Sequence, residues 1–546
     1  MEGNNTISIL LNCHLPFIRH TDSQIYADEM PFFQALSETY IPFLQMLERL
    51  DIDCVPCRIG IVLSPLLAAM FRNTALVDKY LRYVDKQIAF GEVELIRTEN
   101  KHNDSLWKLA RYYYNTIKEK KLAFIERYNK DIISALRYYR QKGRLEILST
   151  AGTHCFLPYY TQYSQIIHTQ FETALTDYRN LFGDNPAGFW LPELGWSKEI
   201  DVFLRRYGIN YTVITAHAAA LADPPGKTGS FYPYRSSEGC FLLVRDHYAF
   251  AEIYGGEDSV TYTPYRAESP ILRIHDGIYC DYYEDIGFKL PQSAVRNFLD
   301  KDGKRLSTGY RYLSAGDKYH VYDRSGAKKR AKKYAGEFLE RRMAALSQAY
   351  SLTGMAPVSL CVWDADSLGR FWQEGFFFLE ELFRLGAAWE NLVFATPFEY
   401  LCRQDSRNFQ TLSPEFSSGA YNGYGEDFLD RPNDWIYRHI YHAIERMTEL
   451  SERFSDESGL RATALNQSVR EILLAQTSDF VKIRHGTEGG AWNEGRILAH
   501  LRNFTAIYES LGGDYLSTKL LAELSAAHSI FPDLNYHVFR KRHSIF

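Results

Sequence analysis

The feature that most constrains the fold is an alternation of short apolar segments with segments of helical spacing. An apolar segment at Ser8–Leu11 is followed by a helical pattern at Pro31–Leu50 and by a second apolar, β-branched segment at Arg58–Leu63. The helical pattern brings its apolar side chains to one face. This alternation predicts parallel strands packed against helices.

The same alternation resumes further along the chain. Strand-like segments are Leu145–Leu148, Gly188–Leu191, Tyr211–Ile214 and Val358–Val362, and helical segments are Thr161–Leu181, Lys198–Tyr207 and Ala327–Leu352. We therefore expect an α/β fold, in which residues 1–400 form a complete or incomplete parallel β/α barrel.

Three regions depart from this alternation. Residues 73–142 are rich in Lys, Arg, Glu, Leu and Tyr and contain no proline, which predicts an inserted helical subdomain. Residues 223–304 are rich in Gly, Pro, Ser and Tyr, and long loops of this kind often form lids or binding loops. We expect Ser230–Tyr234 to belong to such a lid. Residues 401–546 are predicted to form a C-terminal helical domain.

The charge balance excludes some classes of partner. The 62 Lys and Arg residues are nearly matched by 67 Asp and Glu residues, and the net charge is −5. Such a chain lacks the positive field typical of proteins that bind nucleic acid or anionic membranes. With no basic segment followed by a long apolar run at the N-terminus, we expect neither a signal peptide nor a membrane helix, and a cytoplasmic location. The sequence indicates no oligomeric state.

The eight cysteines are scattered along the chain, and we expect them to be reduced. Cys54 and Cys57 form a lone CxxC pair. Tetrahedral zinc needs four ligands, and the sequence offers no further pair of ligands at a suitable spacing nearby. We interpret these two cysteines as structural and predict neither a metal nor a cofactor.

Polar side chains follow four predicted strands. They are His14, His154, Glu193 and Asp364. In β/α barrels the chemistry lies at the carboxyl ends of the strands, so these four side chains are candidates for one site.

Two carboxylates on either side of one bond suit glycosidic cleavage, because one attacks or stabilises C1 while the other protonates the leaving oxygen. Glu193 and Asp364, with Asp366 two positions later, are the candidates. Other interpretations stay open. Acids at strand ends often form salt bridges or helix caps, and two histidines with a carboxylate are also a known metal ligand set.

Tryptophans lie close to both acids in the sequence. They are Trp190 and Trp196 near Glu193, and Trp363 and Trp372 near Asp364. Their rings are suited to stack on sugar faces, although tryptophans near strands more often belong to the core.

Taken together, these segments resemble glycoside hydrolase family 57, particularly its α-glucan branching enzymes and amylase-like members. The resemblance is carried by blocks in the family's order. They are LNCHLPF at Leu11–Phe17, GRLEILSTAGTH at Gly143–His154 with LPYY at Leu157–Tyr160, GFWLPELG at Gly188–Gly195, Asp281–Gly287, WDADSLGRFWQEG at Trp363–Gly375, Asn433–His439 and Leu465–Asp479.

The resemblance implies a distorted seven-stranded β/α barrel with an inserted and a C-terminal helical domain, and a retaining mechanism without metal. It gives Glu193 the place of the nucleophile and Asp364 that of the acid/base. It also implies a glucan-binding subsite, lined by His14, His154, Trp190, Trp363, Trp372 and Asp366. Retention requires the two carboxyl groups to be about 5–5.5 Å apart.

The chain departs from the family pattern in three places. Asn12 and Arg370 stand where histidines are usual, and Phe371 stands where a tryptophan is usual. The branching-enzyme pattern also expects tryptophans around residues 417–428, where this chain has Gly419, Gly425 and Phe428.

The leading hypothesis is therefore a 1,4-α-glucan branching enzyme that acts on amylose, glycogen or maltooligosaccharides. Hydrolysis, as in an α-amylase, and 4-α-glucanotransferase activity remain alternatives, because all share the first half-reaction. A third hypothesis is a catalytically weakened homologue that binds glucan, because of the departures at Asn12, Arg370 and the missing tryptophans.

Overall fold

The computed structural model describes residues 5–100, 104–254, 296–312, 321–419, 422–482, 488–513 and 516–540. These residues fall into two compact units. Unit 1 comprises residues 1–61, 70–146 and 246–400, and unit 2 comprises residues 62–69, 147–245 and 401–546. The block Asp281–Gly287, with residues 255–295 of the predicted loop-rich region, lies outside the described residues.

Unit 1 is built on parallel strands. Strand β1 (Asn5–Cys13) pairs in parallel with β8 (Val358–Asp364) and with β9 (Leu392–Phe394). Nearly every residue of β1 and β8 is buried. Strands that are buried on both faces are typical of a parallel sheet covered by helices, so the predicted α/β class is confirmed.

Helices surround these strands as the alternation predicts. Helices α14 and α15 pack on each other, α15 packs on α2, and α10 and α14 contact β8. Their bounds are Ile41–Ile52 for α2, His247–Tyr254 for α10, Arg324–Thr353 for α14 and Gly375–Gly386 for α15.

The proline-free region of unit 1 is helical, as predicted. Helices α4 (Thr74–Asn100) and α5 (Asp104–Leu122) pack on each other, and α6 (Ile132–Gln141) follows. Each has apolar side chains on its buried face, such as Leu76, Tyr80 and Tyr83 of α4. That this region forms a separate subdomain stays a prediction.

Unit 2 contains a second set of short strands. Strand β3 (Leu145–Thr150) pairs in parallel with β4 (Phe189–Trp190), and a parallel bridge joins Gly188 to Tyr211, the first residue of β5. Strands β10, β6, β7 and β5 form a sheet in that order. Their bounds are Thr411–Leu412, Tyr234–Ser236, Phe241–Val244 and Tyr211–Ile214.

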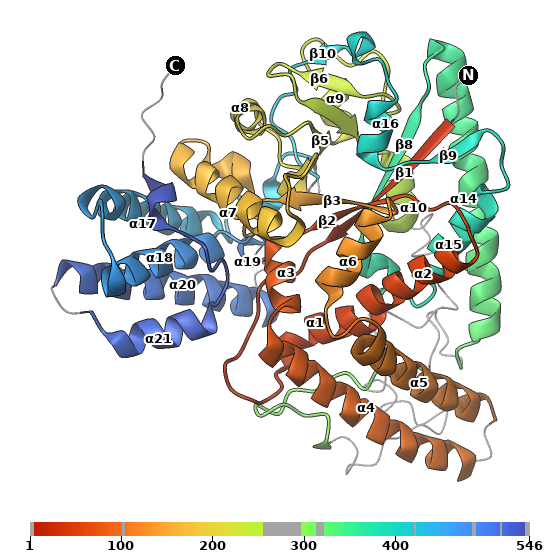
Figure 1. Cartoon of the computed structure of the whole chain (residues 1–546), viewed down its shortest axis with the longest axis horizontal. Coiled ribbons are helices and arrows are strands. Elements are labelled where there is room, and N and C mark those ends of the chain that lie inside the picture. Colours follow the sequence, from red (N-terminus) through yellow and green to blue (C-terminus); the bar gives the residue numbers. More distant parts are fainter. Residues whose placement is uncertain are drawn as a thin grey trace. The chain divides into compact units, whose positions relative to one another are not determined.

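The carboxyl-terminal part of unit 2 is helical, as the sequence predicts. Helix α18 packs against α17, α20 and α21, and these helices lie side by side in Figure 1. Their bounds are Asp434–Arg453 for α17, Gly459–Ala475 for α18, Ser478–Val481 for the short α19, Glu488–Gly512 for α20 and Thr518–Ala527 for α21. The helices described in this structure include none that is both long and apolar enough to span a membrane.

Candidate active site

Glu193 lies in a strained turn directly after β4. It is the middle residue of a 3-10 turn at Pro192–Leu194, with φ 57° and ψ 22°, and Leu194 is also left-handed, with φ 53°. Side chains other than glycine rarely adopt this conformation, and the surrounding structure must hold them in it. Strain of this kind concentrates at functional sites, so the turn supports a functional role for Glu193.

A segment far along the chain holds this turn. Gly419 donates its backbone N–H to the carbonyl oxygen of Glu193 at 2.6 Å, and Trp196 exchanges backbone hydrogen bonds with Ser417 at 2.9 and 3.2 Å. A Cβ atom on Gly419 would lie 3.2 Å from that carbonyl oxygen. A glycine at a position where the family pattern expects a bulky ring therefore lets this segment lie against the backbone of Glu193.

Lys482 approaches the carboxylate of Glu193 and was not among the residues predicted from sequence. Its Nζ atom lies 3.0 Å from Oε2 of Glu193, and the two side chains are 36% and 23% exposed. Burial alone would lower the pKa of Lys482, but the charge and hydrogen bond of Glu193 raise it above the ordinary value. Lys482 stands three residues after the block that ends at Asp479, and that position is the only sequence signal that pointed to it.

Phe428 forms an aromatic wall beneath Lys482. The Nζ atom of Lys482 lies 4.8 Å from the centre of its ring, within the range of a cation–π contact. The ring of Phe428 stacks on Phe156, with centroids 4.5 Å apart, and is fully buried. The phenylalanine at this departure from the family pattern thus retains an aromatic surface.

Asp364 ends β8 and is held by Asn12. The two residues are register partners in the parallel ladder of β1 and β8, so their side chains project from the same face of the sheet. The Nδ2 atom of Asn12 donates to Oδ1 of Asp364 at 3.0 Å. Asp364 is the one exposed residue of its strand, as a residue that meets substrate must be. The asparagine in the place of a usual histidine therefore supplies a hydrogen-bond donor to the proposed acid/base.

Asp366, two residues after Asp364, belongs to a buried polar cluster. It accepts a hydrogen bond from Thr39 Oγ1 at 2.9 Å and forms an ion pair with Arg370 Nη2 at 2.8 Å. Burial raises the pKa of Asp366, while Arg370 and Thr39 oppose that shift and Asp364 adds to it. Arg370, the second departure from the family's usual histidine, therefore balances the charge of a buried carboxylate.

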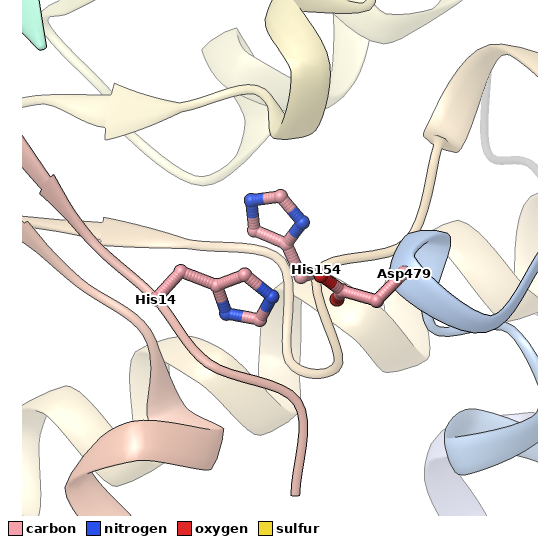
Figure 2. A group of neighbouring side chains, drawn as sticks. All are labelled: His14, His154 and Asp479. Atoms are coloured by element: carbon pink, nitrogen blue, oxygen red, sulfur yellow. The ribbon is translucent and has the colours of Figure 1, made fainter. Parts of the chain in front are cut away.

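His154 lies at the end of the loop after β3, and its backbone is left-handed with φ 53°. Its Nδ1 atom is 2.8 Å from Ser478 Oγ at the start of α19, and the backbone N–H of Ser478 donates to its carbonyl oxygen. A ring nitrogen of His154 and a carboxylate oxygen of Asp479 lie within 4.8 Å of each other (Figure 2). The same figure shows His14, which is half-buried and directly follows β1 in unit 1.

The predicted tryptophans are buried. Trp363 packs against Phe338 and Phe378 and donates its indole N–H to the carbonyl oxygen of Ala249 at 3.0 Å. Trp372 also packs against Phe378 and is 2% exposed. Trp190, on β4, is 5% exposed. A contact of these rings with sugar stays a prediction.

A second cluster of metal-ligand residue types lies in the helical part of unit 2. Glu471 accepts hydrogen bonds from Nδ1 of His500 at 2.8 Å and Nδ1 of His528 at 2.6 Å. Gln467 and Asn503 also donate to it, at 2.8 and 3.1 Å. These separations are those of hydrogen bonds. The amide N–H groups donate to the carboxylate of Glu471, so they satisfy its charge directly and offer no lone pair to a metal ion. The cluster is a buried polar network that joins α18, α20 and the segment after α21.

Within each unit the structure brings some of the sequence-predicted residues together. In unit 1, Asp364 accepts a hydrogen bond from Asn12 and lies close enough to Asp366 to raise the pKa of Asp366. In unit 2, His154 lies beside Ser478 and Asp479, and Glu193 lies beside Lys482. The catalytic and binding roles of the predicted residues stay proposals.

The chain matches known families along most of its length. The model described as glycosyl hydrolase family 57 matches residues 8–301, which is more than half of the chain. The model described as 1,4-alpha-glucan branching enzyme, C-terminal, matches residues 439–539.

Individual proteins of known activity or structure are also similar to this chain. A 1,4-alpha-glucan branching enzyme of Thermococcus kodakarensis is 23% identical over 96% of this chain and 77% of its own length. The solved α-amylase AmyC of Thermotoga maritima is 27% identical, with a TM-score of 0.88 over the whole of both chains. A solved branching enzyme of Pyrococcus horikoshii has a TM-score of 0.85 at 20% identity, over all of this chain and 98% of its own.

These matches agree with the α/β architecture and with the C-terminal helices. The closure of seven strands into a barrel stays a prediction, while the class of fold and the family resemblance are confirmed. The chain belongs to glycosyl hydrolase family 57.

Proposed function

We propose that this chain is a retaining 1,4-α-glucan branching enzyme. The observation that carries the proposal is the match of residues 439–539 to the C-terminal model of branching enzymes. The same region supplies Lys482, the partner of Glu193, so the C-terminal helices of unit 2 contribute directly to the surroundings of the proposed nucleophile. The branching enzyme of Thermococcus kodakarensis, which aligns with 96% of the chain, supports the same assignment.

The reaction proceeds in two half-reactions. Glu193 donates an electron pair from a carboxylate oxygen to C1 of the donor glucan, the C1–O bond breaks, and the leaving oxygen takes the proton of Asp364. The 6-hydroxyl of an acceptor glucan then gives its proton to Asp364, its oxygen bonds to C1, and the bond from C1 to Glu193 breaks. The carboxylate of Glu193 is restored, and the product carries an α-1,6 branch.

The other predicted residues bind the glucan in this proposal. Asn12 orients Asp364 through its amide, and Arg370 balances the buried charge of Asp366. We place the reaction in the cytoplasm, with amylose, glycogen or maltooligosaccharides as substrate. The residues that line the subsite are His14, His154, Trp190, Trp363, Trp372 and Asp366.

A second candidate function is hydrolysis, with water in place of the acceptor hydroxyl. The observation in its favour is the 27% identity to the α-amylase AmyC over the whole of both chains. The two functions share Glu193 and Asp364 and differ in the acceptor of the second half-reaction.

Incubation of the purified protein with amylose separates these functions. The products are treated with a debranching enzyme, their chain lengths are analysed, and reducing ends are counted before debranching. The variants Glu193→Gln and Asp364→Asn test the two proposed carboxylates. Glu415→Gln is the matched control, because Glu415 is a 61% exposed carboxylate that pairs with Lys198 at 2.6 Å.

Short branches that appear only with the wild type and Glu415→Gln are the expected result. Reducing ends without branches would assign hydrolysis instead. Glucan binding without any change of linkage would contradict both enzymatic functions and favour a binding homologue. Full activity of Glu193→Gln would remove that residue from its role.

A further inference from the structure

Lys482 is a charged partner of the proposed nucleophile, and the two residues lie far apart in the sequence of unit 2. Lys482 directly follows α19, and its Nζ atom lies 3.0 Å from Oε2 of Glu193. A separation of this size is that of a charge-assisted hydrogen bond. Glu193 therefore carries a cationic partner that is separated from it by 289 positions in the sequence (482 − 193).

The surroundings hold Lys482 in this orientation. The face of Phe428 lies 4.8 Å from Nζ, and Phe428 is in turn fixed between Phe156, stacked at 4.5 Å, and Tyr437, whose hydroxyl donates to its carbonyl oxygen at 2.7 Å. An ammonium group between a carboxylate and an aromatic face is attracted by both. Lys482 is thus positioned by packed aromatic side chains rather than by a flexible surface contact.

Other charged groups share this environment. Asp479 and Asp427 add smaller negative contributions that also raise the pKa of Lys482. Arg245 is a second cation nearby, with Nη1 at 3.6 Å from the position of a Cβ on Gly419, whose N–H donates to Glu193. His154 lies beside Asp479.

We propose that Lys482 is a positioning residue for Glu193, which keeps its carboxylate ionised and oriented and favours its departure from the glycosyl-enzyme. This inference rests on the proposed function and adds a residue to it. The ammonium group touches the nucleophile and acts through it.

The charge on Glu193 is lost in the first half-reaction and regained in the second, so Lys482 affects the two steps in opposite directions. In the first, Glu193 loses its negative charge as it bonds to C1, so the ion pair with Lys482 is weakened. In the second, the carboxylate leaves C1 and regains its charge, and a cation at 3.0 Å stabilises that charge as it forms. Removal of the lysine therefore slows the second half-reaction more than the first.

The first test measures the ion pair without any need for activity. Lysines are reductively methylated with ¹³C-formaldehyde, which leaves them cationic, and the resonance of Lys482 is assigned by its loss in Lys482→Arg. We expect Lys482 to titrate at lower pH in Glu193→Gln than in the wild type, because burial is then no longer opposed by the carboxylate. An unchanged titration would overturn the inference.

The second test measures kcat and kcat/KM against pH for the wild type, Lys482→Met and Lys482→Arg. An opposite charge within about 4–6 Å typically lowers a carboxyl pKa by about 1–3 units, and partial exposure favours the lower end. We expect the acid limb of kcat/KM to move up by about one pH unit in Lys482→Met. We expect kcat on the plateau to fall roughly tenfold, the equivalent of that one unit.

Lys142→Met is the matched control. Lys142 pairs with Asp51 at 2.6 Å, lies 4.7 Å from the centre of the Tyr138 ring, and the two charged side chains are 40% and 22% exposed. It has the same kind of ion pair and aromatic contact as Lys482, but its carboxylate partner is not part of the proposed machinery.

The outcomes are distinct. A shifted acid limb in Lys482→Met that is restored in Lys482→Arg and absent in Lys142→Met supports the inference. A profile of Lys482→Met that superimposes on the wild type contradicts it, even if branching is confirmed. A wild type that makes no product rejects the proposed function and the catalytic role of the lysine together, while the titration still decides whether the pair exists.

Discussion

The hydrogen bond from Asn12 to Asp364 allows a quantitative prediction about the acid/base. Asn12 Nδ2 lies 3.0 Å from Asp364 Oδ1, at the carboxyl ends of β1 and β8, where the two residues are register partners. A hydrogen bond to a charged acceptor contributes about 1.5–3 kcal/mol when it is shielded from water. Asp364 is exposed, so water replaces part of the lost bond, and about 1–1.5 kcal/mol is a fair expectation.

In Asn12→Ala this loss corresponds to a decrease in kcat/KM of about five- to twelvefold, since 1.36 kcal/mol is a factor of ten. Asn12→Asp has a different effect. Two carboxylates at hydrogen-bond distance share a proton, because their like charges repel. The basic limb of the kcat/KM profile is then expected to move to higher pH.

The assay is the pH dependence of kcat/KM with an activated maltooligosaccharide, and thermal denaturation checks that each variant is folded. Asn5→Ala is the control, because Asn5 lies at the opposite end of the same strand and donates its amide to Ser347 Oγ at 3.3 Å. If Asn12→Ala stays within twofold of the wild type and Asn12→Asp has an unshifted profile, Asn12 does not act on Asp364.

Three further predictions concern the framework around the site. In Glu471→Gln an amide N–H₂ faces two groups that now donate to the carboxylate. Two unsatisfied buried donors at about 1–3 kcal/mol each lower the free energy of unfolding by about 2–6 kcal/mol in urea titrations. A loss below about 1 kcal/mol would contradict the proposed role of this network. Burial lowers the pKa of His500 to about 4, below its value in the unfolded chain. As the pH falls, the unfolded state therefore binds the proton first. The contribution of neutral His500 to stability is complete above about pH 6.5 and is lost as the pH decreases towards 4. Acid titrations of His500→Gln, which lacks that step, test the assignment. Of the seven cysteines in the described residues, Cys54 and Cys402 are exposed and the rest are buried, so a thiol reagent followed by peptide mass spectrometry should label these two first; early labelling of buried Cys361 would refute the packing of β8.

Much of the secondary structure followed from local patterns. The segment Tyr211–Ile214 is a strand with the predicted bounds, and Val358–Val362 extends by two residues to form β8. The absence of proline and the amphipathic spacing of residues 73–142 were sufficient to predict α4, α5 and α6. These features depend on neighbours in the sequence, which is why they were predictable.

The partners of the two acids were not predictable in the same way. Asn12 was recognised as a departure from the family pattern, but its bond to Asp364 depends on the register of β1 with β8. The contact of Lys482 with Glu193 depends on the packing of α18, on the short α19 that follows it and ends directly before Lys482, and on the ring of Phe428 beside the ammonium group. No local pattern encodes either contact, since each joins segments that are hundreds of residues apart.

In the proposed mechanism the carboxylate of Glu193 becomes bonded to C1 of the glucan. A 5-fluoro-α-glucosyl fluoride forms a glycosyl-enzyme that breaks down slowly, so the labelled protein can be digested and its peptides sequenced by mass spectrometry. We expect one added sugar on the peptide that contains Glu193, and none in Glu193→Gln. A label on another carboxylate, or steady turnover of amylose by an enzyme whose Glu193 is never labelled, would contradict it.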